Sequence, residues 1–376
     1  MVNVKEIESY KDSLELIKKA EELYSLESRI FLESTGIYHF PLFCYLVDCG
    51  FHVSIINPII THSSKNVNIR KVKNDKIDSI DIAKLGLSDD IPVSQFPAKL
   101  VLELRSLTRK YYDLTDERSA HINKLKGDLH IVFPQYLDIF CDVTGKTSTM
   151  ILRQYGTPDK ILRGHKKTMI EKISKTSRKG LSKATERYEK LCEPAKAAKN
   201  FGCQIDSVYF NISLTLDLIE NLDKALDSIM QRIHQLVSFH QNEKFIQQIK
   251  WLSTIPGVGF LTAVTIMCEI GDFSAFRNPK QLFAYFGLDP AVKQSGKFEG
   301  TKVQMSKRGS AIARRVIHVL TLQSISTSRT GEAKNPVLRD YYLKKCESKP
   351  KLVAMGAVSH KVCNMIFAIL RDNKPF

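Results

Sequence analysis

The chain has 376 residues, 43% of them hydrophobic, which is enough for two or three globular domains with separate cores. It contains 56 lysines and arginines against 40 aspartates and glutamates, a formal net charge of +16. This excess indicates a polyanionic partner such as nucleic acid, although a merely basic protein has the same balance. No uncharged run reaches about 18 residues, so we expect no membrane span and no membrane partner.

Eight cysteines occur without a CxxC pair or a Cys/His cluster at zinc spacing. They are typical of a reduced protein, and we expect a cytoplasmic, nucleoid-associated location in a bacterium. The first residues are charged and lack an apolar signal-peptide core, so we expect no signal peptide.

The first predicted domain, residues 1–97, alternates short apolar strands with helices. Helical spacing covers 10–26, a strand covers 29–36, an apolar helix covers 40–49, a second strand covers 52–58, and a helix covers 75–87. This order favours a parallel α/β layer.

Three acidic residues in this domain are candidate metal ligands. Glu33 follows the first strand, and Asp75 and Asp78 share one face of the last helix. Carboxylates at a strand end and on a helix suit Mg²⁺ and leave positions for phosphate oxygens. A solvated helix face, with Asp75 stabilised by the helix dipole, is the alternative.

The second predicted region, 98–245, is helical and basic. A long helix covers 99–131 and ends at Phe133-Pro134. The basic stretch 146–200, with breaks at Gly180 and Pro194, is either a surface for nucleic-acid backbone or a solvated linker. From Ile212 to Leu236 apolar residues recur at steps of three and four, which predicts a coiled-coil seam against the 102–131 helix or a second subunit.

The third predicted region, 246–376, contains a helix, the turn Pro256-Gly257-Val258-Gly259, and a second helix. In a basic chain this pattern resembles a helix-hairpin-helix that contacts the sugar-phosphate backbone; a plain αα-hairpin is the alternative. Ser295 places a hydroxyl in a loop that we expect to be flexible. A hydroxyl near cations suits attack on a phosphodiester, and the candidate cations follow: Lys307, Arg308, Arg314 and Arg315.

Ordered motifs along the chain together resemble the bridge-RNA-guided insertion-sequence transposases called the one-ten family. They are Glu33-Ser-Thr-Gly, Lys73-Asn-Asp-Lys-Ile-Asp-Ser, Phe133-Pro, Ile255-Pro-Gly-Val-Gly, Glu269-Ile-Gly-Asp, Phe283-Ala-Tyr-Phe-Gly-Leu-Asp-Pro, Gln294-Ser-Gly and Ser306-Lys-Arg-Gly. The resemblance extends over nearly the whole chain, and the order of the motifs carries it.

The resemblance implies a RuvC-like (RNase H-like) DEDD domain in which Glu33, Asp75 and Asp78 bind Mg²⁺. It also implies a C-terminal transposase domain with Ser295 as nucleophile and a covalent phosphoserine–DNA intermediate. Element ends and target DNA, a structured guide RNA, and a homo-oligomer, dimer or tetramer, are the implied partners. The family's first Asp, in a Gly-Ile-Asp context, has no counterpart here, so we expect an N-terminally truncated domain lacking its first strands.

Two other functions stay open from the residues. In the first, only the acids act, and the protein is a metal-dependent, structure-specific DNA nuclease. In the second, the chain is an inactive remnant that binds DNA or RNA.

Overall fold

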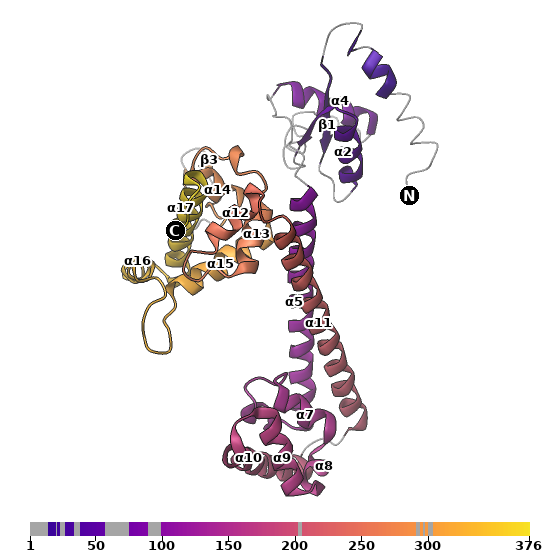
Figure 1. Ribbon diagram of the computed structural model, residues 1–376, viewed down its shortest axis with the longest axis vertical. Coiled ribbons are helices and arrows are strands. Elements are labelled where there is room, and N and C mark those ends of the chain that lie inside the picture. Colours follow the sequence, from indigo (N-terminus) through magenta and orange to yellow (C-terminus); the bar gives the residue numbers. More distant parts are fainter. Residues whose placement is uncertain are drawn as a thin grey trace. The chain divides into compact units, whose positions relative to one another are not determined.

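A computed structural model describes residues 14–19, 21–22, 27–33, 38–56, 75–88, 99–201, 205–290, 294–295, 298–299 and 304–376. The chain divides into two compact units, Met1–Ala98 and Lys99–Phe376. Within the described residues most of the structure is helical, with one two-stranded parallel sheet in the first unit (Figure 1).

The first unit is built on the parallel pair β1 (Arg29–Glu33) and β2 (His52–Ile56), in the register Arg29↔His52 to Glu33↔Ile56. The helix α2 (His39–Asp48) connects them, as parallel strands require a crossover. Its buried residues Phe43 and Leu46 pack with the second strand. The predicted parallel α/β layer is therefore confirmed for this part of the chain.

The helix α4 (Asp75–Ser88) lies against β1. Gly86 makes the approach close, because a Cβ at this position would overlap the ring of Phe31. Any larger residue would push the helix away from the strand.

The second unit is organised on two long helices, α5 (Lys99–Val132) and α11 (Asp206–Phe239), which pack along each other. Leu104 near the start of α5 and Ile233 near the end of α11 belong to one core. Leu125 and Ile212, at the opposite ends of the same helices, belong to another. The helices are therefore antiparallel, and the apolar row of α11 faces α5, one of the two partners expected for it.

A small helical domain, which we call the α6–α10 domain, closes one end of this helix pair. It comprises α6 (Tyr136–Ile139), α7 (Lys146–Gln154), α8 (Pro158–Arg163), α9 (Lys166–Ser177) and α10 (Gly180–Phe201). Buried Ile151, Ile173 and Leu191 give it a core shared with the helix pair. The expectation of a solvated linker over 146–200 is wrong for this reason.

The expected break at Pro194 is also wrong, because Pro194 lies inside α10. Proline removes one helical hydrogen bond. Ala195 and Ala198 beyond it are buried in the core, and this packing holds the helix together across the missing bond. The break at Gly180 is real, since this residue has φ +78° and separates α9 from α10.

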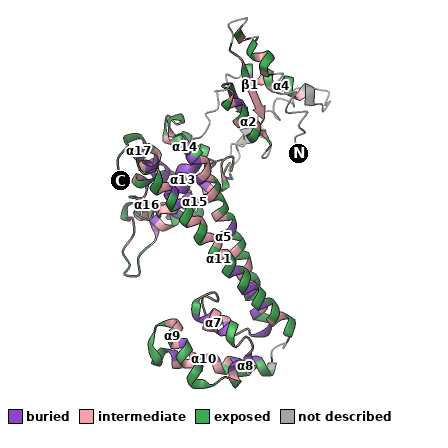
Figure 2. Cartoon of the chain, turned by 45° about the vertical axis from the view of Figure 1, so that its right-hand side comes forward, coloured by how far each residue is buried: buried purple, intermediate pink, exposed green. Residues whose placement is uncertain are grey.

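The other end of the pair carries the C-terminal domain. Its elements are α12 (Lys244–Leu252), α13 (Phe260–Ile270), η1 (Phe273–Ala275), α14 (Pro279–Tyr285), β3 (Gln294–Ser295), β4 (Phe298–Glu299), α15 (Ala311–Ile325), α16 (Pro336–Cys346) and α17 (Lys351–Asp372). Figure 2 shows buried residues gathered in both end domains of the second unit.

The helix α17 is long and apolar enough, by length and composition, to cross a membrane. Half of its apolar window is buried inside the protein, and Val358, Cys363 and Ile366 lie in the core of the C-terminal domain. This pattern is typical of the core helix of a globular domain.

Candidate functional site

The acidic residues of the first unit lie on two elements that touch. Glu33 ends β1, opposite Ile56 of β2, and is half-buried. Asp75 begins α4 and Asp78 lies one turn further, half-buried; the side chain of Asp75 is outside the described residues. The contact between Gly86 and Phe31 holds the helix that bears both aspartates against the strand that bears Glu33.

Among the side chains that the structure describes, no three of His, Cys, Asp and Glu converge on one point. Because Asp75 is not among those side chains, the trio stays a prediction. The donor set itself fits a hard divalent cation, since a strand-end carboxylate and helix carboxylates are the oxygen ligands such ions prefer.

Ser295 lies in a short antiparallel β-strand pair, where the sequence predicted a loop. Gln294–Ser295 pairs antiparallel with Phe298–Glu299, and Ser295 stands opposite Phe298. Two residues, Gly296 and Lys297, separate these partners, the length of the shortest hairpin connections. The side chain of Ser295 is outside the described residues.

Both ends of the segment that carries this hairpin are fixed to each other. Pro290 forms an antiparallel bridge with Met305. The Ser306 N–H donates to the carbonyl oxygen of Asp289 at 2.8 Å, and the Ser306 hydroxyl donates to the Asp289 carboxylate at 2.5 Å. We call residues 286–290 and 305–309 the clamp.

Two glycines allow the clamp to close. A Cβ on Gly287 would lie 2.5 Å from the backbone nitrogen of Gly309, and a Cβ on Gly309 would overlap the carbonyl oxygen of Tyr285. Gly287 also has φ +67°, and Lys307, whose N–H donates to the Gly287 carbonyl oxygen at 3.0 Å, has φ +54°. Glycine is required wherever two backbones approach this closely.

The Pro256–Gly259 turn joins α12 to α13 as predicted. Gly257, at φ +94°, faces Gln323 of α15, where a Cβ would lie 3.4 Å from the Gln323 Cβ. Gly259 is exposed and precedes α13 as its N-cap, with nothing near its Cβ position. The first turn of α13 therefore keeps its N–H groups near the surface, where a phosphate can accept from them.

The four candidate cations differ in their partners. Lys307 and Arg308 lie in the clamp and are exposed. The Arg314 guanidinium donates to the Gly309 carbonyl oxygen at 2.5 Å. Arg315 donates to the Asp116 carboxylate at 2.7 Å and lies over the ring of Tyr112.

A buried carboxylate lies close to the clamp. The side chain of Glu269 on α13 is 2% exposed and accepts two hydrogen bonds from Arg109 of α5, at 2.9 and 3.0 Å. Arg105, one turn earlier on α5, donates to the neighbouring Cys268 carbonyl oxygen at 2.7 Å. The Tyr285 hydroxyl, beside the clamp, donates to the Glu269 carbonyl oxygen at 3.2 Å.

Burial has the largest influence on the pKa of Glu269 and raises it, but hydrogen bonds from Arg109 and Ser310 and the charges of Arg109 and Arg105 together outweigh burial. The pKa of Glu269 therefore lies below its usual value, and the carboxylate stays ionised. Ser310 also caps α15 by accepting from the Ala313 N–H at 3.2 Å. One carboxylate thus connects α5, α13 and the start of α15.

Sequence comparisons place two known domains on this chain. Residues 249–343 match the family described as Transposase IS116/IS110/IS902 family. Residues 3–134 match the IS110-type DEDD domain, described as Transposase. The chain belongs to the IS116/IS110/IS902 transposase family.

Two relatives of this transposase match most of its length, and a third matches a shorter part at higher identity. The uncharacterized 43.6 kDa protein of insertion element IS110 from Streptomyces coelicolor is 21% identical over 86% of this chain and 77% of its own. The pilin gene-inverting protein of Moraxella bovis is 23% identical over 92% of this chain and 81% of its own length. The transposase of element IS1111A from Coxiella burnetii is 30% identical over 97 residues, about a quarter of each chain.

Membership assigns Glu33, Asp75 and Asp78 to a DEDD domain, which implies use of a divalent metal. It assigns Ser295 and the clamp to the C-terminal transposase domain. The α6–α10 domain lies outside both matched ranges, so the family matches assign it no role.

Sequence reasoning missed the role of Glu269 and its arginines in this transposase. A signal was present, because Glu269 is the one charged residue in the α13 sequence FLTAVTIMCEI. An acid that an apolar helix carries into a core is almost never buried without a partner. The partner Arg109 lies 160 residues earlier, and no spacing rule connects the two.

Proposed function

We propose that this transposase exchanges DNA strands under the guidance of a structured RNA, with Ser295 as the nucleophile and Mg²⁺ at the acids of the first unit. The observation that carries the proposal is the clamp, which fixes both ends of the Ser295 hairpin within the domain matched to the transposase family. A nucleophile has to be held in place, and a loop with anchored ends provides this.

In the proposed step the Ser295 oxygen bonds to a DNA phosphorus, and the bond from that phosphorus to its leaving sugar oxygen breaks. The serine proton leaves, and the sugar oxygen gains a proton. The reverse reaction with a different sugar hydroxyl joins the new strands and restores the serine. Attack by a serine hydroxyl conserves the energy of the phosphodiester in the covalent intermediate.

Lys307 and Arg308 are the proposed cations that neutralise the phosphate in this step. Both are exposed, and both lie in the segment of the clamp that follows the hairpin in the sequence. Cations aimed at a transferring phosphoryl group stabilise the charge that develops on its oxygens. Arg314 and Arg315 donate to Gly309 and Asp116 within the protein, so we assign them a supporting role at this surface and not direct contact with the phosphate.

We propose that the Pro256–Gly259 turn contacts the sugar-phosphate backbone of DNA as a helix-hairpin-helix. Gly259 is exposed, and the start of α13 offers N–H groups there, whereas Gly257 supports the turn against α15. Such contacts position DNA without reading its sequence. A guide RNA would then supply the sequence information.

Glu33, Asp75 and Asp78 would hold Mg²⁺ through their carboxylate oxygens. When bound, the ion would supply charge neutralisation at the reacting phosphate. The protein's own contribution is the packing of α4 on β1 at Gly86 and Phe31, which holds the helix that bears the aspartates on the strand that bears Glu33. Replacement of any one of these carboxylates should weaken metal binding.

We further propose that the protein acts as a homo-oligomer, dimer or tetramer. Phe210, Leu214 and Leu218 form an exposed apolar row along α11, at 64%, 46% and 47% exposure. Each is one helical turn from the next, so they share one face. An exposed apolar face of this kind is typical of a protein–protein interface.

Rejoining of DNA is favoured over simple cleavage by the names of the relatives. One is named as a transposase and another as a protein that inverts a pilin gene. Inversion of a gene requires that cut ends be joined again, which a nuclease alone does not do.

The test is a recombination assay with the purified chain, Mg²⁺, the element's RNA transcript, and DNA bearing the element ends and the target. We expect joined products and a protein–DNA adduct with the wild type, and neither with Ser295→Ala. Ser182→Ala, an exposed serine of α10, is the matched control and should behave as wild type.

The alternatives give different results in the same assay. Cleavage that survives Ser295→Ala but is lost in Asp75→Ala would establish the structure-specific nuclease. Binding of DNA and RNA without any product by the wild type would establish the inactive remnant.

A further inference from the structure

The α6–α10 domain carries a large share of the positive charge of the chain. Residues 136–201 contain 15 lysines and arginines against 7 aspartates and glutamates. This net charge of +8 is half of the total of +16, in fewer than a fifth of the residues. The domain lies outside both family matches, so membership does not explain this concentration.

Most acids of the domain are already paired. Three glutamates form ion pairs with lysines: Glu186 with Lys190, Glu189 with Lys166, and Glu193 with Lys196. Asp159 binds both Arg163 and Lys199. The remaining cations of the domain therefore have few acids available to them.

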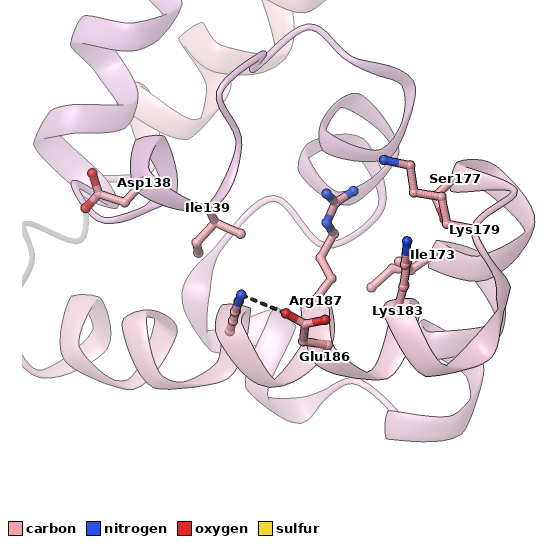
Figure 3. Close-up of a pocket in the computed structure, with 9 residues that line it drawn as sticks. Asp138, Ile139, Ile173, Ser177, Lys179, Lys183, Glu186 and Arg187 are labelled. Atoms are coloured by element: carbon pink, nitrogen blue, oxygen red, sulfur yellow. Dashed lines mark hydrogen bonds and ion pairs between the residues drawn. The ribbon is translucent and has the colours of Figure 1, made fainter. Parts of the chain in front are cut away.

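Three of these remaining cations line one cavity. Lys179, Lys183 and Arg187 border a space of about 230 Å³ between α6, the end of α9 and α10. In Figure 3 their charged ends extend into the same region, while Glu186 turns away to Lys190. The exposed carboxylate of Asp138, which also lines the cavity, lies apart from them beyond Ile139.

None of the three forms an ion pair within the described parts of the chain, and the Arg187 guanidinium lies over the ring of Phe140. The Glu186 carboxylate, which also lines the cavity, is paired with Lys190, which lowers its pKa most; the charges of Lys183 and Arg187 lower that pKa further. Lys183 and Arg187 are one helical turn apart, so their like charges repel. An anion between them would remove this repulsion and occupy the cavity. The sequence thus gathers cations around this cavity, where the neighbouring glutamate, Glu186, is already paired with Lys190, and a bound anion would relieve their repulsion.

A second cavity, of about 370 Å³, adjoins the first and shares Lys179 and Arg187 with it. It is lined by Lys146, Thr147 and Ser148, the first turn of α7, whose N-cap Gly145 provides no capping side chain. The positive end of α7 and the shared cations therefore face one continuous groove. The Asp142 carboxylate at the edge of this groove accepts hydrogen bonds from the N–H and the hydroxyl of Thr144.

We propose that this groove binds the phosphodiester backbone of a nucleic acid. Two adjoining cavities with shared cations suit consecutive phosphates of a polymer better than a single small anion. The cations are mostly lysines, which contact phosphate as point charges without reading bases. The inference rests on the proposed function only in expecting DNA and RNA as the available polymers.

The test measures how binding of the full chain to duplex DNA and to the RNA transcript depends on salt. The variant is Lys179→Gln/Lys183→Gln/Arg187→Gln. The matched control, Lys166→Gln/Lys196→Gln/Lys199→Gln, removes the same charge from cations that are already paired. The polymer whose binding changes identifies the source of the phosphate.

For the groove variant we expect the slope of log K against log salt to fall by about 2 to 3 with duplex DNA, or about 2 with single-stranded RNA. The control should change it by less than about 1. Equal changes in both variants, or no change in either, would overturn the proposal. The charge-conserving Lys179→Arg/Lys183→Arg should keep the wild-type slope.

Failure of this proposal is distinguishable from failure of the proposed function. Ser295→Ala should bind both polymers with the wild-type slope, although it cannot recombine them. A groove variant that binds and recombines as wild type would refute the groove as a nucleic-acid site and leave the proposed serine mechanism unaffected.

Discussion

The two ends of the α5–α11 pair use positive charge in opposite ways. In the C-terminal domain Arg105 and Arg109 are bound to the Cys268 carbonyl oxygen and to the buried Glu269 carboxylate. In the α6–α10 domain Lys183 and Arg187 border a cavity and form no ion pair among the described residues, because the nearby Glu186 carboxylate is paired with Lys190. A basic composition alone does not separate these cases, whereas the presence of an internal acceptor does.

The largest difference between the two ends should appear on removal of one arginine. Arg109→Met leaves the Glu269 carboxylate buried and unpaired, and should lower the free energy of unfolding by about 3 kcal/mol. Arg187→Met removes a cation that forms no ion pair among the described residues and should change this free energy by less than about 1 kcal/mol. Chemical denaturation of both variants measures this. Equal losses would contradict the distinction between the two ends.

The clamp should be nearly as sensitive. Gly309→Ala forces a Cβ against the Tyr285 carbonyl oxygen and should cost about 1–3 kcal/mol, with recombination falling by at least about tenfold. Gly356→Ala, in α17 of the same domain, places its Cβ in open space and is the matched control. Wild-type recombination by Gly309→Ala would show that the clamp does not position the hairpin.

Acid should weaken the C-terminal domain through Glu269. The pKa of this carboxyl is lowered in the folded state, so it stabilises the protein above its unfolded pKa of about 4.3. That contribution is lost as the pH falls from there through the folded pKa. Unfolding at pH 7 and pH 3 should show a larger loss for the wild type than for Glu269→Gln. The same loss in both proteins would exclude this carboxyl as the cause.

The smallest effect concerns the exposed cations of the clamp. Arg308→Ala should lower the slope of log K against log salt for DNA by about 0.9, the value for one phosphate contact. Lys349→Ala, an exposed lysine between α16 and α17, should leave the slope unchanged. A slope that is unaffected by Arg308→Ala would place DNA away from the clamp.

Local patterns predicted much of this fold. The spacing of apolar and polar residues predicted both strands of the first unit, the two long helices and the two helices that flank the Pro256–Gly259 turn. The clamp was beyond such reasoning, because Pro290 and Met305 pair across a segment with only two-residue strands. Strands that short have no period to detect.

The candidate site divides in the same way. Motif order placed Ser295 and the acids on the correct domains, but it did not show that Glu269 and Arg109 form a buried pair. It also gave Arg314 and Arg315 the same role as Lys307 and Arg308, because sequence shows charge and not partners. For Pro194, a local rule predicted a break, and packing of the neighbouring alanines prevented it.

The central claim is tested most directly by mapping the covalent adduct. The wild-type protein is incubated with RNA, Mg²⁺ and DNA, denatured, digested with nuclease and protease, and analysed by peptide mass spectrometry. The account predicts a nucleotide remnant attached to the Ser295 oxygen. A remnant on any other residue, or joined DNA formed without an adduct, would contradict it.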